Sequence, residues 1–181
     1  MRSWIVILAL LTPSVTFGQS VAEPRSITAT PFVGVSFGTG SGRNSSIGLG
    51  GAVGYDFTSN LGFEAELGHV FDVVSDTDFV DWSITNVSFN AVYHFDVVRV
   101  TPYATFGLGF ERSSLSLEGD VAPAIALIPS STEIAYNFGG GVKYRVGDKM
   151  LARADLRRFQ ANDFAPDHWR LYGGLTFVLR R

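Results

Sequence analysis

Apolar and polar positions alternate strictly over residues 168–179. One set of alternate residues is almost wholly apolar: Trp169, Leu171, Gly173, Leu175, Phe177 and Leu179. The other set is polar or small: His168, Arg170, Tyr172, Gly174 and Thr176. Because successive side chains of a β-strand point to opposite faces, this alternation predicts a strand with one apolar face.

The same alternation recurs about eight times, in segments of the roughly 10 residues that a transmembrane β-strand needs. We predict strands over residues 28–38, 46–57, 60–71, 82–95, 100–112, 133–146, 149–160 and 168–179. In lipid, every backbone N–H and C=O must be paired internally, so the strands have to form a closed sheet. The expected fold is all-β, an eight-stranded antiparallel up-and-down transmembrane β-barrel.

The connections between these segments alternate in length, which predicts the orientation of the barrel. Short connections at residues 58–59, 96–99 and 147–148 are expected in the periplasm, and the four longer ones outside the cell. Aromatic residues beside the short connections predict a periplasmic girdle of Tyr55, Phe57, Tyr93, Phe95 and Tyr144. The expected outer girdle is Phe37, Phe71, Phe110, Tyr136 and Trp169.

The first 22 residues have the pattern of a secretory signal peptide. Arg2 is followed by an apolar run over residues 4–11 and then by small residues, with cleavage expected after Gly18 or after Ala22. The run is too short for a membrane helix, which needs about 20 apolar residues. Residues 23–181 then form one domain, the barrel.

Composition narrows the function classes. The formal net charge is −3, which gives no reason to expect nucleic-acid binding. The chain has no cysteine, so disulfides and thiol chemistry are excluded. We expect no cofactor and no metal.

Charged residues at inward positions predict a polar interior. The set is Glu64, Glu66, Glu111, Lys143, Arg145, Arg153, Asp155, Arg157 and Arg170. We expect these charges to form a salt-bridged plug, because buried charges persist when paired and eight strands leave little lumen. A proton or ion pathway is the alternative.

Other chemistry has weaker support. The histidines fall on different strands, with His69 at the outer rim facing lipid, His94 at the periplasmic end and His168 at the top of the last strand. A Ser-His-acid arrangement is recognised in space, so a lipid-modifying enzyme stays an alternative. A soluble ligand-binding barrel would place its apolar face inward, which the aromatic residues near the turns disfavour.

The outer loops hold two further features. Asp72, Asp76, Asp78 and Asp81 are expected to form a solvated acidic loop rather than a calcium site. The apolar run at residues 121–129 has two interpretations. It contacts a partner or another cell surface or dips into the outer leaflet, or else it folds over the barrel mouth or extends the flanking strands. Arg158, predicted to face lipid, either meets a lipopolysaccharide phosphate or extends to the interface.

Three stretches resemble the small OmpA-like outer-membrane β-barrel domain family: residues 31–38, residues 102–110, and residues 151–157 together with Gly173-Gly174-Leu175-Thr176-Phe177. The resemblance spans nearly all of the chain after the signal peptide. It implies an anchor, an adhesin or a narrow pore, with a charged interior and no active site.

Together these patterns predict a non-enzymatic protein of the bacterial outer membrane with a structural or surface-interaction role. A narrow pore and an outer-membrane lipid-modifying enzyme are the alternatives. The expected partners are outer-membrane lipid and lipopolysaccharide, the barrel-assembly machinery, and an extracellular molecule that the outer loops contact.

Overall fold

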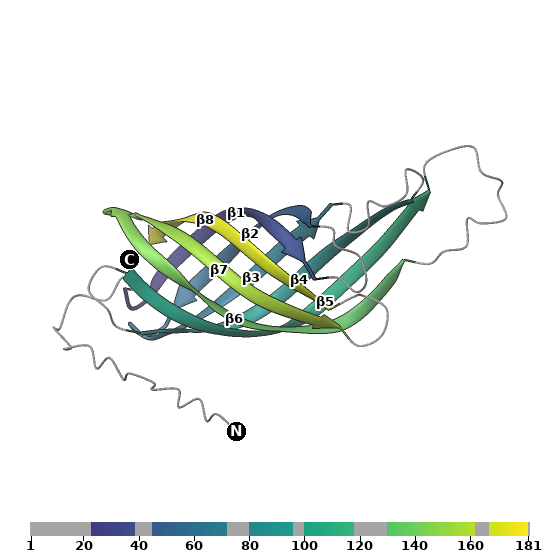
Figure 1. Ribbon diagram of the computed structural model, residues 1–181. Coiled ribbons are helices and arrows are strands. Elements are labelled where there is room, and N and C mark those ends of the chain that lie inside the picture. Colours follow the sequence, from purple (N-terminus) through teal and green to yellow (C-terminus); the bar gives the residue numbers. More distant parts are fainter. Residues whose placement is uncertain are drawn as a thin grey trace, which may run out of the picture.

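The computed structural model describes residues 23–38, 45–71, 80–95, 100–117, 130–161 and 167–180, which form a closed antiparallel barrel (Figure 1). The strands are β1 (Ser26–Phe37), β2 (Ser46–Asp56), β3 (Leu61–Val70), β4 (Val80–His94), β5 (Val100–Leu117), β6 (Ser131–Gly147), β7 (Met150–Ala161) and β8 (His168–Arg180). Each strand pairs with its neighbours in sequence, and β8 pairs with β1. The predicted fold and strand order are confirmed. No helix among the described residues is long and apolar enough to cross a bilayer.

The seam between β1 and β8 closes the sheet. Val33 lies opposite Gly173 and Val35 opposite Leu171, in antiparallel register. The pairing shifts once, between Ile27 and Thr28. Because β1 and β8 pair with each other, neither strand presents a free edge to lipid along this seam.

The ends of the barrel differ in their connections. Short turns join β2 to β3 and β6 to β7, at the end that also holds Ser26 and Arg180. In the first turn, Thr58 Oγ1 accepts a hydrogen bond from the Leu61 N–H at 2.9 Å. We call this end periplasmic and the opposite end outer, following the usual orientation of such barrels.

Three strands run farther toward the outer end than the sequence predicts. β4 begins at Val80, β5 ends at Leu117 and β6 begins at Ser131. The added part of β5 pairs through its backbone, with Ser113 opposite Ser131. On the outward face of β5, Phe110 is followed by the polar residues Arg112 and Ser114, so the apolar face stops before the hydrogen-bonded ladder does.

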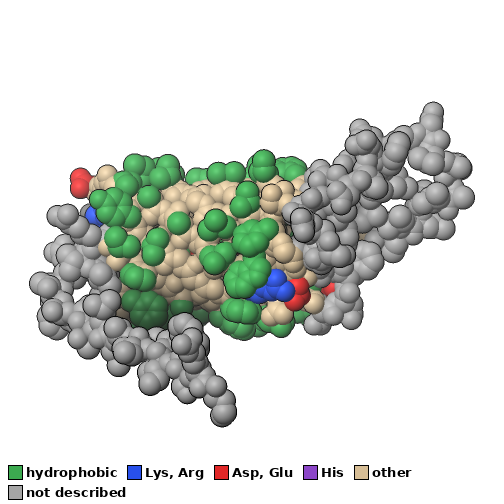
Figure 2. Space-filling model, viewed as in Figure 1, with side chains coloured by type: hydrophobic (Ala, Val, Ile, Leu, Met, Phe, Trp, Pro, Cys, Tyr) green, Lys and Arg blue, Asp and Glu red, His purple; other side chains and the backbone are tan. Residues whose placement is uncertain are grey.

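The barrel is apolar outside and polar inside. Phe89 on the outer wall is 65% exposed, whereas the side chain of Arg157 in the lumen is 0% exposed. Figure 2 shows hydrophobic side chains over the wall, with the few visible charged side chains toward the two ends. This arrangement fits a wall in contact with lipid, and it rules out a barrel built around an apolar ligand cavity.

The structure places both sets of predicted girdle residues on the outward face of the barrel. In the periplasmic set, the ring centroids of Tyr55 and Phe57 are 4.7 Å apart, and those of Tyr93 and Phe95 are 5.2 Å apart. In the outer set, Phe71 packs edge-on against His69 at 4.5 Å. The other members also face outward: Tyr144, Phe37, Phe110, Tyr136 and Trp169.

The signal peptide and two loop features lie outside the described residues. These are residues 1–22, the acidic loop with Asp72, Asp76 and Asp78, and the apolar run at residues 121–129. The side chain of Asp81 also lies outside them.

Candidate functional site: a charged network across the lumen

Two strands on opposite sides of the barrel supply the central charges. Glu64 and Glu66 alternate on β3, and Arg153, Asp155 and Arg157 alternate on β7. Alternate residues share a face, and all five side chains are buried in the lumen. β3 and β7 are four strands apart in a closed ring of eight, so their ion pairs cross the full width of the lumen.

Arg157 and Arg153 each bind more than one carboxylate. Arg157 Nη1 lies 3.0 Å from Glu66 Oε2, and Arg157 Nη2 lies 3.1 Å from Asp155 Oδ1. Arg153 pairs with both oxygens of Glu64 and also with Asp155. We call these five residues the central network. Bidentate guanidinium–carboxylate pairs are strong, and sharing them among five groups leaves none of these five charges unpaired.

Two tyrosines flank the central network. The Tyr103 hydroxyl accepts a hydrogen bond from Arg153 Nε at 2.7 Å, and the Tyr172 hydroxyl donates one to Glu66 at 3.1 Å. The guanidinium of Arg153 also lies over the Tyr103 ring, 5.2 Å from its centroid. Gly141 makes room for Tyr103, since a Cβ there would come within 2.6 Å of the tyrosine hydroxyl.

The outer half of the lumen holds a second group of polar side chains. Arg170 donates to Asn86 Oδ1 at 2.7 Å and lies 3.6 Å from Glu66, which links it to the central network. His168 lies 3.8 Å from Glu111 and stacks on Phe159. Polar contacts therefore continue from the central network toward the outer end of the lumen.

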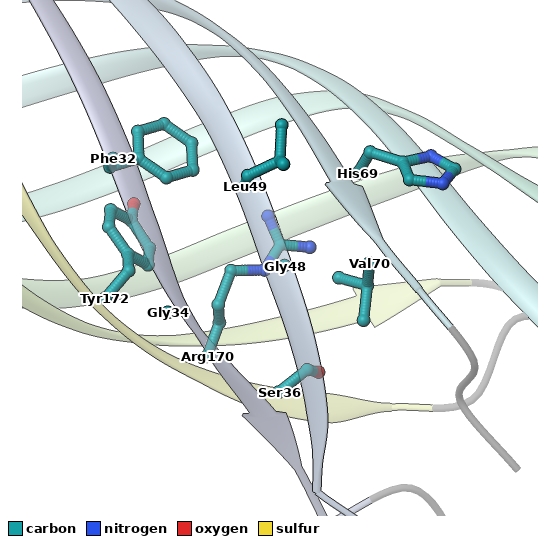
Figure 3. Close-up of a pocket in the computed structure, with 9 residues that line it drawn as sticks. All are labelled: Phe32, Gly34, Ser36, Gly48, Leu49, His69, Val70, Arg170 and Tyr172. Carbon is teal, nitrogen blue, oxygen red and sulfur yellow. The ribbon is translucent and has the colours of Figure 1, made fainter. Parts of the chain in front are cut away.

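Close packing leaves little open space beside Arg170. A Cβ on Gly68 would approach Asn86 Oδ1 to 2.5 Å and Arg170 Nη1 to 2.9 Å, so a larger residue there would have to displace the ends of these two side chains. Figure 3 shows the neighbouring cavity between β1, β2, β3 and β8, with Phe32 and Tyr172 side by side and with Arg170 and Gly48 among the residues that line it. This cavity measures about 10 Å³, enough for about one water molecule.

The periplasmic half of the lumen is held by Lys143, His94 and Asp56. Lys143 Nζ lies 2.9 Å from His94 Nε2, and His94 Nδ1 lies 4.0 Å from Asp56. Ser26 donates a hydrogen bond to Asp56 at 3.2 Å. All four residues are buried, so polar side chains fill this end of the lumen as well.

Eight of the nine predicted lumen charges lie inside the barrel, and the prediction for Arg145 is wrong. The Arg145 side chain is 34% exposed at the periplasmic rim, where it lies 3.6 Å from Glu23 and donates to the Asp148 carbonyl. It precedes the β6–β7 turn, and the strand pairing shifts between Arg145 and Gly147. The alternation therefore carries it beyond the closed part of the lumen.

The sequence reasoning missed the uncharged and aromatic members of the lumen. Tyr103, Asn86 and Phe32 occupy inward positions that alternation alone could have identified. Tyr172 was placed on the polar face of its strand but was not counted with the charges. These residues carry no formal charge, so a search for charged inward positions does not find them.

The histidines do not form a shared site. His94 and His168 are buried at opposite ends of the lumen, whereas His69 faces outward, with Nδ1 2.8 Å from the Thr85 hydroxyl. Among the described residues, no group of three or more histidines and carboxylates could hold a metal ion.

Arg158, on the outer face of β7, is held by neighbours within the protein. Its guanidinium lies 3.0 Å from Asp167 and 5.7 Å from the centroid of the Trp169 ring. Asp167 neutralises the positive charge of Arg158, which a lipopolysaccharide phosphate would need for binding.

A family model described as the outer membrane protein beta-barrel domain matches residues 7–177. The chain belongs to this family. It is an OmpA-like barrel of the bacterial outer membrane. No curated protein sequence matches the chain.

Solved structures show the same fold. The N-terminal barrel of Pseudomonas aeruginosa OprF is 22% identical, with a TM-score of 0.64 over 86% of this chain and 98% of that one. Neisserial surface protein A is 19% identical, with a TM-score of 0.65 over 85% and 96%. The attachment invasion locus protein Ail of Yersinia pestis is 16% identical, with a TM-score of 0.56 over 86% and 100%.

Proposed function

We propose that this barrel is a non-conducting anchor in the outer membrane that acts through contacts at its outer end. The central network carries this proposal, because it spans the lumen from β3 to β7 and all of its side chains are buried. An ion that crossed the barrel would have to separate these pairs. Doing so would leave charges unpaired in a low-dielectric interior, at a cost of several kcal/mol.

The filling of the lumen on both sides of the central network supports the same role. Tyr103 with Lys143 and His94 lies on the periplasmic side, and Tyr172 with Arg170 and Asn86 lies on the outer side. An interior that is filled along its length leaves the loops and the outward face as the surfaces available to other molecules.

The names of two structural neighbours agree with a role at the cell surface. One is a neisserial surface protein, and another is an attachment invasion locus protein. We propose that this chain likewise contacts an extracellular molecule through its outer loops.

Planar-bilayer recording tests the proposal. Purified protein reconstituted into a bilayer is expected to give no conductance steps above background. The double variant Glu66→Ala/Arg157→Ala is the matched positive control, because it removes two large groups from the lumen and leaves Arg153 paired with Glu64 and Asp155. It is expected to conduct, which would show that the assay detects an opened lumen.

A narrow pore is the second candidate, because unpartnered polar atoms lie on both sides of the central network. Both Glu111 oxygens and the Ser113 hydroxyl toward the outer end, and the Thr101 hydroxyl toward the periplasmic end, are buried without a hydrogen-bond partner among the described residues. If water reached these polar atoms from both ends, only the central network would stand between the two water-filled halves and block the passage of ions. Discrete steps from the unaltered protein, with an ion selectivity that changes in Arg153→Gln, would support this pore and contradict the anchor.

A further inference from the structure

A row of four polar side chains crosses the outward face of neighbouring strands near the outer end. His69 on β3 lies opposite Thr85 on β4, Thr85 lies opposite Arg112 on β5, and Arg112 lies opposite Thr132 on β6. All four follow the outward alternation of their strands, and none is buried. We call these four residues the outer rim row.

The outer rim row lies at the boundary of the apolar wall on β4, β5 and β6, and on β3 one exposed aromatic residue, Phe71, lies beyond it. The next outward position toward the periplasm on each of the same strands is occupied by Leu67, Val87, Phe110 and Ile134, all exposed. On the other side of the row, Ser83 lies opposite Ser114. The row therefore lies where acyl chains give way to headgroups.

Arg112 provides an exposed positive charge in this row. Its Nη2 donates to the Ser130 hydroxyl at 3.2 Å, and no carboxylate of the described residues lies within ion-pair distance of it. Arg158, two strands away on β7, differs, because Asp167 neutralises it at 3.0 Å. Both arginines lie on the outward face, and of these two only Arg158 has a carboxylate partner among the described residues.

The neighbours of Arg112 add hydrogen-bonding groups of another kind. Thr85, Thr132 and Ser130 carry hydroxyls beside the guanidinium, and the Thr85 hydroxyl is held 2.8 Å from the His69 ring. A guanidinium pairs well with phosphate, while hydroxyls and imidazole exchange hydrogen bonds with sugar hydroxyls.

We propose that the outer rim row binds the phosphorylated saccharide headgroup of a glycolipid in the outer leaflet. Its level on the wall selects a membrane lipid, because acyl chains of a lipid bound there would lie along Leu67, Val87, Phe110 and Ile134. Its charge selects phosphate, and its hydroxyls select a sugar. The site lies on the outward face, so it does not depend on whether the lumen conducts.

Native mass spectrometry of the purified barrel in detergent tests this site, with bis-phosphorylated lipid A as the probe. Arg112→Gln is expected to weaken lipid A binding about tenfold, since it removes a charge-assisted hydrogen bond to phosphate. Thr85→Val, which loses one neutral hydrogen bond, is expected to weaken it about threefold. The matched control Arg158→Gln is expected to change binding by less than about twofold, because that arginine is already paired.

Two further probes separate the lipid classes. Lipid A stripped of its phosphates is expected to bind the unaltered protein about as weakly as lipid A binds Arg112→Gln. Phosphatidylglycerol, which carries a phosphate without a saccharide, is also expected to bind more weakly than lipid A. Gel mobility before and after boiling checks that each variant is folded.

Several results would overturn the proposal. These are failure of lipid A to bind the unaltered protein, equal binding of phosphatidylglycerol, unchanged binding by Arg112→Gln, or an equal loss in Arg158→Gln. The last would show that any arginine on the rim contributes equally.

Discussion

Arg157 shows how single residues stabilise the lumen. Its guanidinium contacts carboxylates on both sides of the barrel, namely Glu64 and Glu66 on β3 and Asp155 on its own strand. Removing it would leave these buried acids short of a partner. Removing Glu66 together with Arg157 would do less harm, since Arg153 still serves Glu64 and Asp155.

We therefore predict strong coupling between Glu66 and Arg157. Arg157→Met is expected to lower the free energy of unfolding by about 3–5 kcal/mol, because buried carboxylates lose their cation. The double variant Glu66→Leu/Arg157→Met is expected to be clearly more stable than the sum of the two single changes implies. Denaturant unfolding in lipid vesicles, followed by gel mobility, measures the stability of Glu66→Leu, of Arg157→Met and of the double variant.

Arg158→Gln is the control for this cycle, because its ion pair is partly exposed and is expected to contribute less than about 1 kcal/mol. Additive effects of the Glu66 and Arg157 changes would contradict the cross-lumen network.

Alternation predicted the direction of individual side chains well, because the side-chain period of a strand is two and a shift of one residue reverses every face. It placed Glu64 and Arg153 on inward positions without any knowledge of their partners. It could not show that Arg153 binds Glu64 across the barrel, because that contact depends on closure of the sheet. It failed for Arg145, where the register shift interrupts the pairing.

At the scale of elements, the turns were predicted more closely than the outer strand ends. The β6–β7 turn is short and follows a glycine, which is a strong local signal. At the outer end, β5 and β6 continue through serines as a backbone ladder, with no change in hydrophobicity to mark where they stop. Strand length there depends on pairing between segments, which local sequence does not report.

Cysteine labelling tests the orientation of these elements. The chain has no cysteine, so single cysteines can be placed without background. Ser130→Cys beside β6 at the outer end is expected to react with a membrane-impermeant maleimide on intact cells. Lys149→Cys in the β6–β7 turn is the matched site at the other end, and it is expected to react only after the outer membrane is opened. Labelling of Lys149→Cys alone on intact cells would reverse the assigned orientation.

At the scale of the whole molecule, one principle explains both surfaces of the wall. Lipid outside requires apolar side chains and a sheet without free edges, and a ring of eight strands then encloses a space that side chains can fill. This requirement made the fold predictable from alternation and loop length. The function was less predictable, because the outer loops that we propose to contact partners carry few chemical motifs.

Amide hydrogen exchange of the barrel in vesicles tests the closed wall most directly. The account predicts that the amides paired across the β1–β8 seam, from Phe32 to Phe37 and from Trp169 to Gly174, exchange as slowly as those between β4 and β5. Fast exchange confined to the seam, with slow exchange elsewhere, would show an open sheet and would contradict the closed barrel on which the plugged lumen depends.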